Sequence, residues 1–133
     1  MIYFVEQIEW KWRNTKHEAL HLEIGCGKGR FTAETAAQNP NVFLAAVEKV
    51  PDAMVVGMER VTDRGLTNVR FLDFDAKNLL EIFEPGEVSR IYINFPDPWK
   101  KARQKKRRLT WGAFLALYAQ LLPLGGEIWF KSD

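Results

Sequence analysis

Short apolar runs alternate along this chain with longer segments in which apolar residues recur every three or four positions. The runs have the length of buried strands and cover residues 20–24, 42–47, 68–74, 90–95 and 127–130. The longer segments have the period of helices and include residues 33–37, 51–64, 77–83 and 114–121. Residues 1–19 show no clean period, so we expect a short helix or an irregular lead-in there.

This alternation predicts an α/β fold with a mainly parallel sheet. Strands joined through helices form right-handed crossovers, which place helices on both faces of the sheet. We expect residues 20–133 to form this one domain and residues 1–19 to precede it. The chain stops directly after the last strand, at Lys131-Ser132-Asp133, which leaves an exposed sheet edge and indicates that later strands are missing.

Composition narrows the class of protein. Hydrophobic residues make up 47% of the chain and charged residues 27%, as in ordinary globular domains. No apolar run approaches the roughly 20 residues of a membrane helix, and no signal peptide pattern is present, so we expect a cytoplasmic protein. Cys26 is the only cysteine, and no Cys/His cluster has the spacing of a zinc site. An internal disulfide is therefore excluded, and we expect no metal.

A glycine-rich turn follows the first strand, in Glu23-Ile-Gly-Cys-Gly-Lys-Gly29. Gly25 and Gly27 allow a tight turn and let a ligand approach the backbone where a Cβ would collide. The spacing is not the Gly-x-Gly-x-x-Gly that binds a pyrophosphate, and a carboxylate at Glu23 would repel one. The same carboxylate would attract the ammonium or sulfonium group of S-adenosylmethionine, so the turn favours this cofactor over NAD.

Two further acidic residues stand at expected strand ends. Glu48 closes the second strand and suits ribose hydroxyls, whereas Asp75 ends the third and can accept a hydrogen bond from an adenine amino group. Taken singly, a glycine turn is often structural, Glu48 could be a solvated strand end, and Asp75 could be a helix N-cap. Because the carboxyl ends of parallel strands meet at one edge, Glu23, Glu48 and Asp75 together favour an adenosine ligand.

A second motif, Asn94-Phe-Pro-Asp-Pro-Trp99, follows the fourth strand and is continued by a basic run up to Thr110. Together they resemble the signature of the bacterial tRNA (guanine-N7) methyltransferases, which are class I S-adenosylmethionine-dependent enzymes. The glycine motif, Glu48, Asp75 and Phe130-Lys-Ser-Asp133 match that family in order and approximate spacing. The resemblance therefore covers nearly the whole expected domain.

The resemblance implies a Rossmann-like class I methyltransferase core and methyl transfer from S-adenosylmethionine to N7 of guanosine 46 in the tRNA variable loop. The residues that would contact the cofactor are Glu23, Gly25, Gly27, Glu48, Asp75, Ala76, Asn94 and Asp97. Asp97 would also be the catalytic residue, and Lys101 and Asp133 match positions that contact the RNA. Lys100 stands where many members of the family carry proline, which leaves the path of this loop open.

Asp97 suits this reaction on chemical grounds. Guanine N7 carries a lone pair and no proton, so the enzyme must align N7 with the methyl group and stabilise the positive charge on the purine. A carboxylate at Asp97 can do the latter, and Pro96 and Pro98 restrict its backbone. The alternative is an ordinary turn residue between prolines. Adenine-N6 methyltransferases carry two adjacent prolines in a related motif, and here an aspartate separates them.

Seven of the nine residues from Lys100 to Arg108 are basic, although the net charge of the chain is only +2. Beside the candidate site, such a run suits phosphate neutralisation and predicts a tRNA clamp. Arg107 and Arg108 precede the last helix and are better fixed than Lys105, so we rank them above Lys105 as substrate-binding residues. The alternative is a solvated basic loop with no partner.

Two other functions stay open. The chain could be a fragment that binds cofactor or RNA without catalysis, because the family continues through further strands and a Thr/Glu-containing motif. A nicotinamide-dependent oxidoreductase is the second alternative, against which Glu23 and the short glycine spacing argue. The sequence leaves monomer and homodimer equally open.

Overall fold

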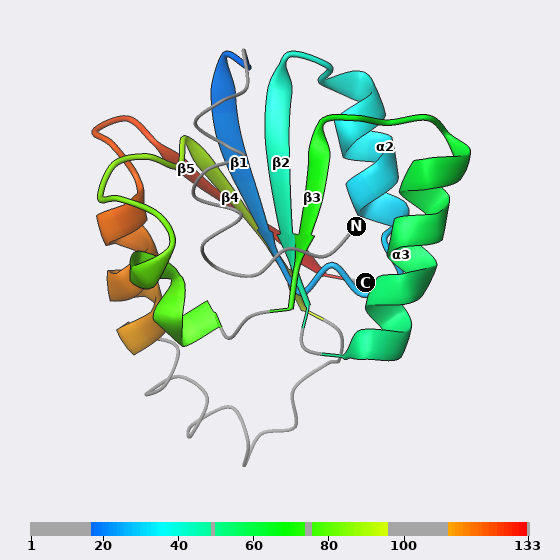
Figure 1. Cartoon of the computed structure of the whole chain (residues 1–133). Helices are drawn as coiled ribbons and strands as arrows, with labels where there is room; N and C mark the ends of the chain where they lie inside the picture. The colour runs from blue at the N-terminus through cyan, green and yellow to red at the C-terminus, as the bar shows by residue number, and fades with distance from the viewer. Residues whose placement is uncertain (1–16, 49, 74–75, 96–111, 133) are drawn as a thin grey trace.

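Within the part of the chain that the structure describes, five parallel strands form one sheet with helices on both faces (Figure 1). The computed structural model describes residues 17–48, 50–73, 76–95 and 112–132. The strands are β1 (Ala19–Ile24), β2 (Val42–Val47), β3 (Val69–Leu72), β4 (Arg90–Phe95) and β5 (Glu127–Ser132). The helices are α2 (Arg30–Gln38), α3 (Pro51–Asp63), the 3-10 helix η1 (Ala76–Glu81) and a helix at residues 112–121. The expected α/β fold is thus confirmed.

The strand order in the sheet is β3-β2-β1-β4-β5, and every neighbouring pair is parallel. Glu23 in β1 stands in register with Ala46 in β2 on one side and with Tyr92 in β4 on the other. The chain therefore places β2 and β3 on one side of β1 and then crosses over to place β4 and β5 on the other side. Sheets of this kind bind ligands at the carboxyl ends of the strands that flank such a reversal.

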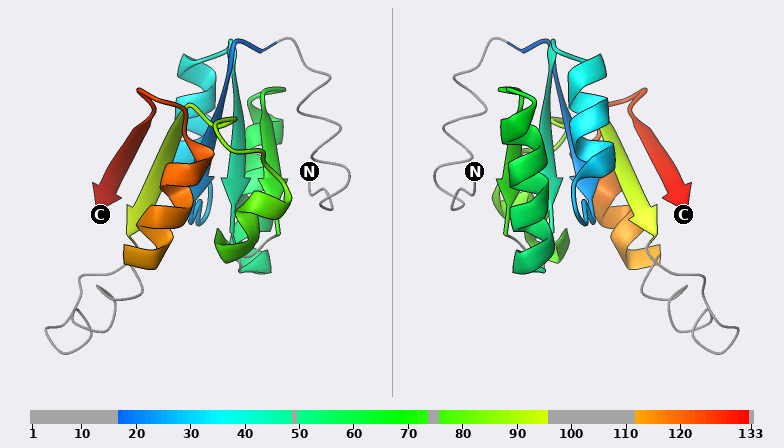
Figure 2. Two further views of the ribbon diagram at one scale, coloured as in Figure 1. Left: turned by 90° about the vertical axis from the view of Figure 1, so that its left-hand side faces the viewer. Right: turned by 90° about the vertical axis from the view of Figure 1, so that its right-hand side faces the viewer.

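The sheet separates two apolar clusters, and helices cover both of its faces (Figure 2). Leu20 and Leu22 pack on the face covered by η1 and the helix at 112–121, together with Tyr118 and Leu121. The other face is covered by α2 and α3, and its cluster contains Ala33, Ala36, Met54, Phe71 and Tyr92. Among the described helices, none is long and apolar enough to cross a membrane.

Element boundaries differ from the expected ones mainly around β3. The strand covers Val69–Leu72 and does not begin at Asn68. The side-chain amide of Asn68 is buried and donates hydrogen bonds of 2.9–3.0 Å to three carbonyl oxygens, those of Ala36, Asn39 and Val42. Asn68 therefore fastens the end of α2 and the start of β2. Further along the chain, η1 is a 3-10 helix that stands where we expected a helix at residues 77–83.

Candidate functional site

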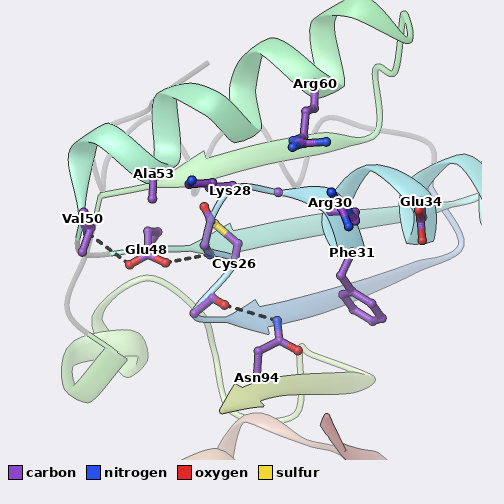
Figure 3. A pocket seen from close by; sticks show the side chains of 13 residues that line it. Cys26, Lys28, Arg30, Phe31, Glu34, Glu48, Val50, Ala53, Arg60 and Asn94 are labelled. Atoms are coloured by element: carbon purple, nitrogen blue, oxygen red, sulfur yellow. Dashed lines mark hydrogen bonds between the residues drawn. The ribbon is translucent and has the colours of Figure 1, made fainter. Parts of the chain in front are cut away.

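A cavity of about 710 Å³ surrounds the glycine turn at the carboxyl end of β1 (Figure 3). Its lining comes from the turn, from the ends of β2 and β4, and from α2 and α3. The lining residues are Gly25, Cys26, Gly27, Lys28, Gly29, Arg30, Phe31, Glu34, Glu48, Val50, Ala53, Arg60 and Asn94. Four of the residues predicted to contact a cofactor, Gly25, Gly27, Glu48 and Asn94, thus line one cavity.

The glycine turn has a backbone that other residues rarely adopt. Gly25, Gly27 and Gly29 have φ values of 77°, 54° and 77°, in the left-handed region where a Cβ is strained. The amides of Gly25 and Cys26 both donate to the carbonyl oxygen of Val47, at 2.9 and 3.1 Å. The turn is therefore fastened to the end of β2, and its remaining surface is exposed to the cavity.

Glu48 holds the same turn through its side chain. Its Oε1 accepts a hydrogen bond of 2.7 Å from the amide of Gly27, and its Oε2 accepts one of 3.1 Å from the amide of Val50. Each carboxylate oxygen has two lone pairs, so these bonds are compatible with acceptance from a ligand hydroxyl as well. Figure 3 shows Glu48 and Asn94 on opposite sides of the turn.

Glu23 lies beneath the cavity and does not line it. Its side chain is fully buried at 0% exposure. The hydroxyl of Thr32 donates to its Oε1, and the amide nitrogen of Asn94 donates to its Oε2 at 2.6 Å. The same Asn94 nitrogen also lies 3.3 Å from the carbonyl oxygen of Gly25. The carboxylate therefore links β1, α2 and β4 below the ligand-accessible surface.

The amide oxygen of Asn94 has a different environment from its nitrogen. It is buried and has no hydrogen-bond partner within the described structure. A buried acceptor without a partner is costly and is rare in native proteins. Asn94 also lines the cavity. The oxygen itself is covered in the structure, so Asn94 walls the cavity without exposing this acceptor to it.

Cys26 contributes no reactive group to the cavity. Burial raises the pKa of its thiol, and the nearby Glu23 and Glu48 carboxylates raise it further. The thiol therefore stays protonated at neutral pH, and a protonated thiol is a poor nucleophile and metal ligand. Cys26 is therefore a small, buried residue of the turn.

Three basic side chains in the lining were not identified from the sequence. Lys28 and Arg30 flank Gly29 in the turn, and Arg60 reaches the cavity from α3 (Figure 3). Lys28 lies within the glycine motif and Arg30 directly follows it, but the fold sets their direction toward the cavity. Arg60 has no local signal in the sequence because only the packing of α3 brings it there.

The remaining predicted site residues fall mostly outside the described ranges. These are Asp75, Asp97, Lys101, Arg107, Arg108 and Asp133. Ala76 begins η1, directly after the third expected strand end. Within the ranges that the structure covers, no group of three or more His, Cys, Asp or Glu residues could hold a metal ion.

Comparison of the sequence with known families shows which family of proteins the chain belongs to. Residues 17–133 match the model of a family described as "Putative methyltransferase". The chain belongs to this methyltransferase family. It is 46% identical over 114 residues to the tRNA (guanine-N(7)-)-methyltransferase of a Geobacillus species, and 44% identical over 114 residues to that of Bacillus subtilis. Each match covers 86% of this chain, which spans about half the length of these relatives, 52% and 54%.

Solved methyltransferase structures share the fold. TrmN from Thermus thermophilus superposes with a TM-score of 0.70 and 25% identity over 95% of this chain and 36% of its own. Coclaurine N-methyltransferase bound to S-adenosylhomocysteine has a TM-score of 0.64 at 18% identity, over 95% of this chain and 33% of its own. The Rossmann-like methyltransferase core expected from the sequence is therefore confirmed.

Proposed function

We propose that this protein transfers a methyl group from S-adenosylmethionine to N7 of guanosine in tRNA, at position 46 of the variable loop. The observation that carries the proposal is the cavity around the glycine turn, walled by Glu48 and Asn94, in a chain that is 46% identical to a tRNA (guanine-N(7)-)-methyltransferase. Cytoplasmic location and tRNA as the partner follow from this proposal.

The residues of the cavity fit S-adenosylmethionine. Glu48 can accept hydrogen bonds from ribose hydroxyls, and Asn94 lines the same cavity. Lys28 and Arg30 can neutralise the methionine carboxylate. Positive φ at Gly25 and Gly27 lets the ligand approach the backbone closely. When bound, the cofactor supplies an electrophilic methyl group on a positively charged sulfur.

The protein's own part in the reaction is alignment and charge stabilisation. Guanine N7 needs no deprotonation, so the groups around it must hold the purine in line and offset its developing positive charge. Sequence places Asp97 after β4, three residues beyond Asn94, and we assign it both tasks. Asp75 would hold the adenine amino group. Lys101, Arg107, Arg108 and Asp133 would contact the RNA.

Calorimetry with S-adenosylhomocysteine tests the cofactor site directly. We expect the 133-residue chain to bind it and to show no heat with NAD, because Glu23 and the short glycine spacing disfavour a pyrophosphate. Binding of NAD without binding of S-adenosylhomocysteine would refute the proposal and favour an oxidoreductase.

Transfer of tritiated methyl groups to unmodified tRNA tests the activity. Asp97→Ala should abolish transfer to tRNA while the circular dichroism spectrum stays unchanged, since Asp97 stabilises charge on the reacting purine. A tRNA with adenosine in place of guanosine 46 is the matched control and should accept no label. Cofactor binding without transfer by the unmodified chain would support the alternative, a fragment that binds without catalysis.

A further inference from the structure

Arg60 reaches the cavity from a helix that contributes no predicted cofactor contact. It lies in the last turn of α3 and lines the same cavity as the glycine turn. The rise of an α-helix places it roughly 13 Å along the axis from Pro51, where α3 begins. Figure 3 shows Arg60 and Asn94 on opposite sides of the turn. Arg60 therefore extends the cavity wall beyond the ribose site that we propose at Glu48.

A close backbone contact between the glycine turn and α3 brings Arg60 to this position. A Cβ at Gly29 would lie 2.5 Å from the Cα of Gly57, so the two backbones touch. Gly57 precedes Arg60 by three residues, and residues three apart are neighbours on one helix face. The side chain of Arg60 therefore starts beside the beginning of α2, where Lys28 and Arg30 flank Gly29. Three cations from two segments thus line one cavity.

The side chains of these three cations have no partner in the described part of the chain. Neither Lys28, Arg30 nor Arg60 forms an ion pair or a side-chain hydrogen bond with a described residue. The Nε of Arg60 is buried, whereas its two terminal nitrogens are not among the buried groups. The terminal nitrogens of a guanidinium form a planar fork that suits two oxygens of one phosphate. Arg60 can therefore offer this fork to an anion in the cavity.

Arg60 also has a structural effect, which Arg64 shares. A positive charge near the end of a helix is favourable because the helix dipole is negative there. Arg60 stands in the last turn of α3, and Arg64 is the C-cap of the same helix. Arg64 is exposed and is not among the residues that line the cavity. The two arginines therefore share the effect on the helix and differ in their access to the cavity.

We infer that Arg60 binds a backbone phosphate of tRNA at the α3 side of the cavity. The inference rests on the proposed function, because it takes the polyanion at this cavity to be the RNA substrate. Lys28 and Arg30 flank the turn and suffice for the one carboxylate of the cofactor, whereas Arg60 carries positive charge further along α3. Such an additional cation suits the repeated phosphates of a nucleic acid. The cofactor carboxylate is the other anion that could reach Arg60.

Filter binding of unmodified tRNA over a salt series tests the inference on the 133-residue chain. Arg60→Gln should weaken binding on the order of tenfold at low salt, since it removes a charge-assisted contact. It should also reduce the slope of log affinity against log salt by about 0.7–0.9. Arg60→Lys keeps the charge and should keep the slope. Arg64→Gln is the matched control, and it should leave affinity and slope unchanged.

Calorimetry with S-adenosylhomocysteine separates an RNA contact from a cofactor contact. Arg60→Gln should bind it within about twofold of the unmodified chain, because no cofactor contact is removed. A larger loss would overturn the inference and assign Arg60 to the cofactor carboxylate. Equal salt slopes for Arg60→Gln and Arg64→Gln would overturn the inference alone, because the unmodified chain still binds tRNA. If the unmodified chain binds no tRNA, the proposed substrate fails and the inference fails with it.

Discussion

At the residue scale, three glycines of one turn meet different physical constraints. Gly25, Gly27 and Gly29 all have positive φ, but a Cβ at Gly29 would lie 2.5 Å from the Cα of Gly57 in α3. A Cβ at Gly27 would have nothing within 4 Å. Two substitutions in the same turn can therefore separate the effect of backbone strain on stability from the effect of the close contact with α3.

We predict that Gly29→Ala lowers the free energy of unfolding by roughly 2–5 kcal/mol, because left-handed strain and a backbone collision add together. Gly27→Ala should cost only the strain, about 1–2 kcal/mol. Urea unfolding followed by circular dichroism measures both values. Equal losses for the two variants would show that the contact between the turn and α3 contributes nothing.

The sequence predicts which residues gather at this site better than it predicts how deeply their side chains are buried. The positions of Glu48 and Asn94 at this site are predictable because each stands at the end of a predicted strand. The burial of Glu23 could not, because it depends on Thr32 in α2 and on Asn94, which is 71 residues away in the chain. The direct contact of Glu23 with a cofactor stays a prediction, and the structure shows it 0% exposed beneath the cavity.

At the element scale, a cluster of side chains joins β1, β4 and β5 on the face that also carries α2. Arg90 forms an ion pair of 2.8 Å with Glu127, and its guanidinium lies 3.9 Å from the ring centroid of Trp129. Tyr92 accepts a hydrogen bond of 3.1 Å from Arg90 and packs edge-on against His21. These contacts fix the register of three neighbouring strands.

His21 makes this cluster sensitive to pH. Burial, followed by the nearby charge of Arg90, lowers the pKa of His21 from 6.5 to about 4, although Glu127 acts in the opposite direction. Between pH 6.5 and about 4 the unfolded chain binds a proton at this residue and the folded chain does not. Stability should therefore fall as pH decreases through this window, by on the order of 2 kcal/mol.

Replacement of the His21 imidazole by a side chain that does not titrate tests this pH dependence of stability. His21→Gln has no titrating group, so its free energy of unfolding should change less with pH than that of the unmodified chain. Urea unfolding at several pH values between about 7 and 4.5 gives both curves. Parallel curves would mean that His21 is protonated in the folded state or contributes nothing.

Local periodicity predicts the strands and helices well, but it does not predict their order in the sheet. Each element has its own apolar period, whereas strand order depends on which side of β1 each crossover takes. Asn68 shows a second limit. Periodicity places it in the third strand, but its side-chain amide donates to carbonyl oxygens 26–32 residues away, in segments that local periodicity does not connect.

At the scale of the whole molecule, the proposed binding of tRNA should depend on charge. Changing Lys101, Arg107 and Arg108 to Glu removes three positive charges and adds three negative ones, which takes the net charge from +2 to −4. We expect weaker tRNA binding and a smaller slope of log affinity against log salt, by about 0.7–0.9 for each lost phosphate contact. Filter binding over a salt series measures the slope.

Arg64→Glu is a control for this experiment. It reverses one exposed charge at the end of α3 and should leave the slope unchanged. A slope that stays constant when Lys101, Arg107 and Arg108 are reversed would remove the basic run from the RNA-binding surface.

The central place of β1 also affects how the protein is made. β2 supplies one wall of the cavity soon after the glycine turn is synthesised, but Asn94 supplies the other only after β4 has paired with β1. A nascent chain that ends before β4 therefore has the turn and Glu48 without a closed cavity. A ligand of this cavity should therefore stabilise chains in which β4 has paired with β1 more than shorter nascent chains, so the residues before β4 gain less from it while they are synthesised.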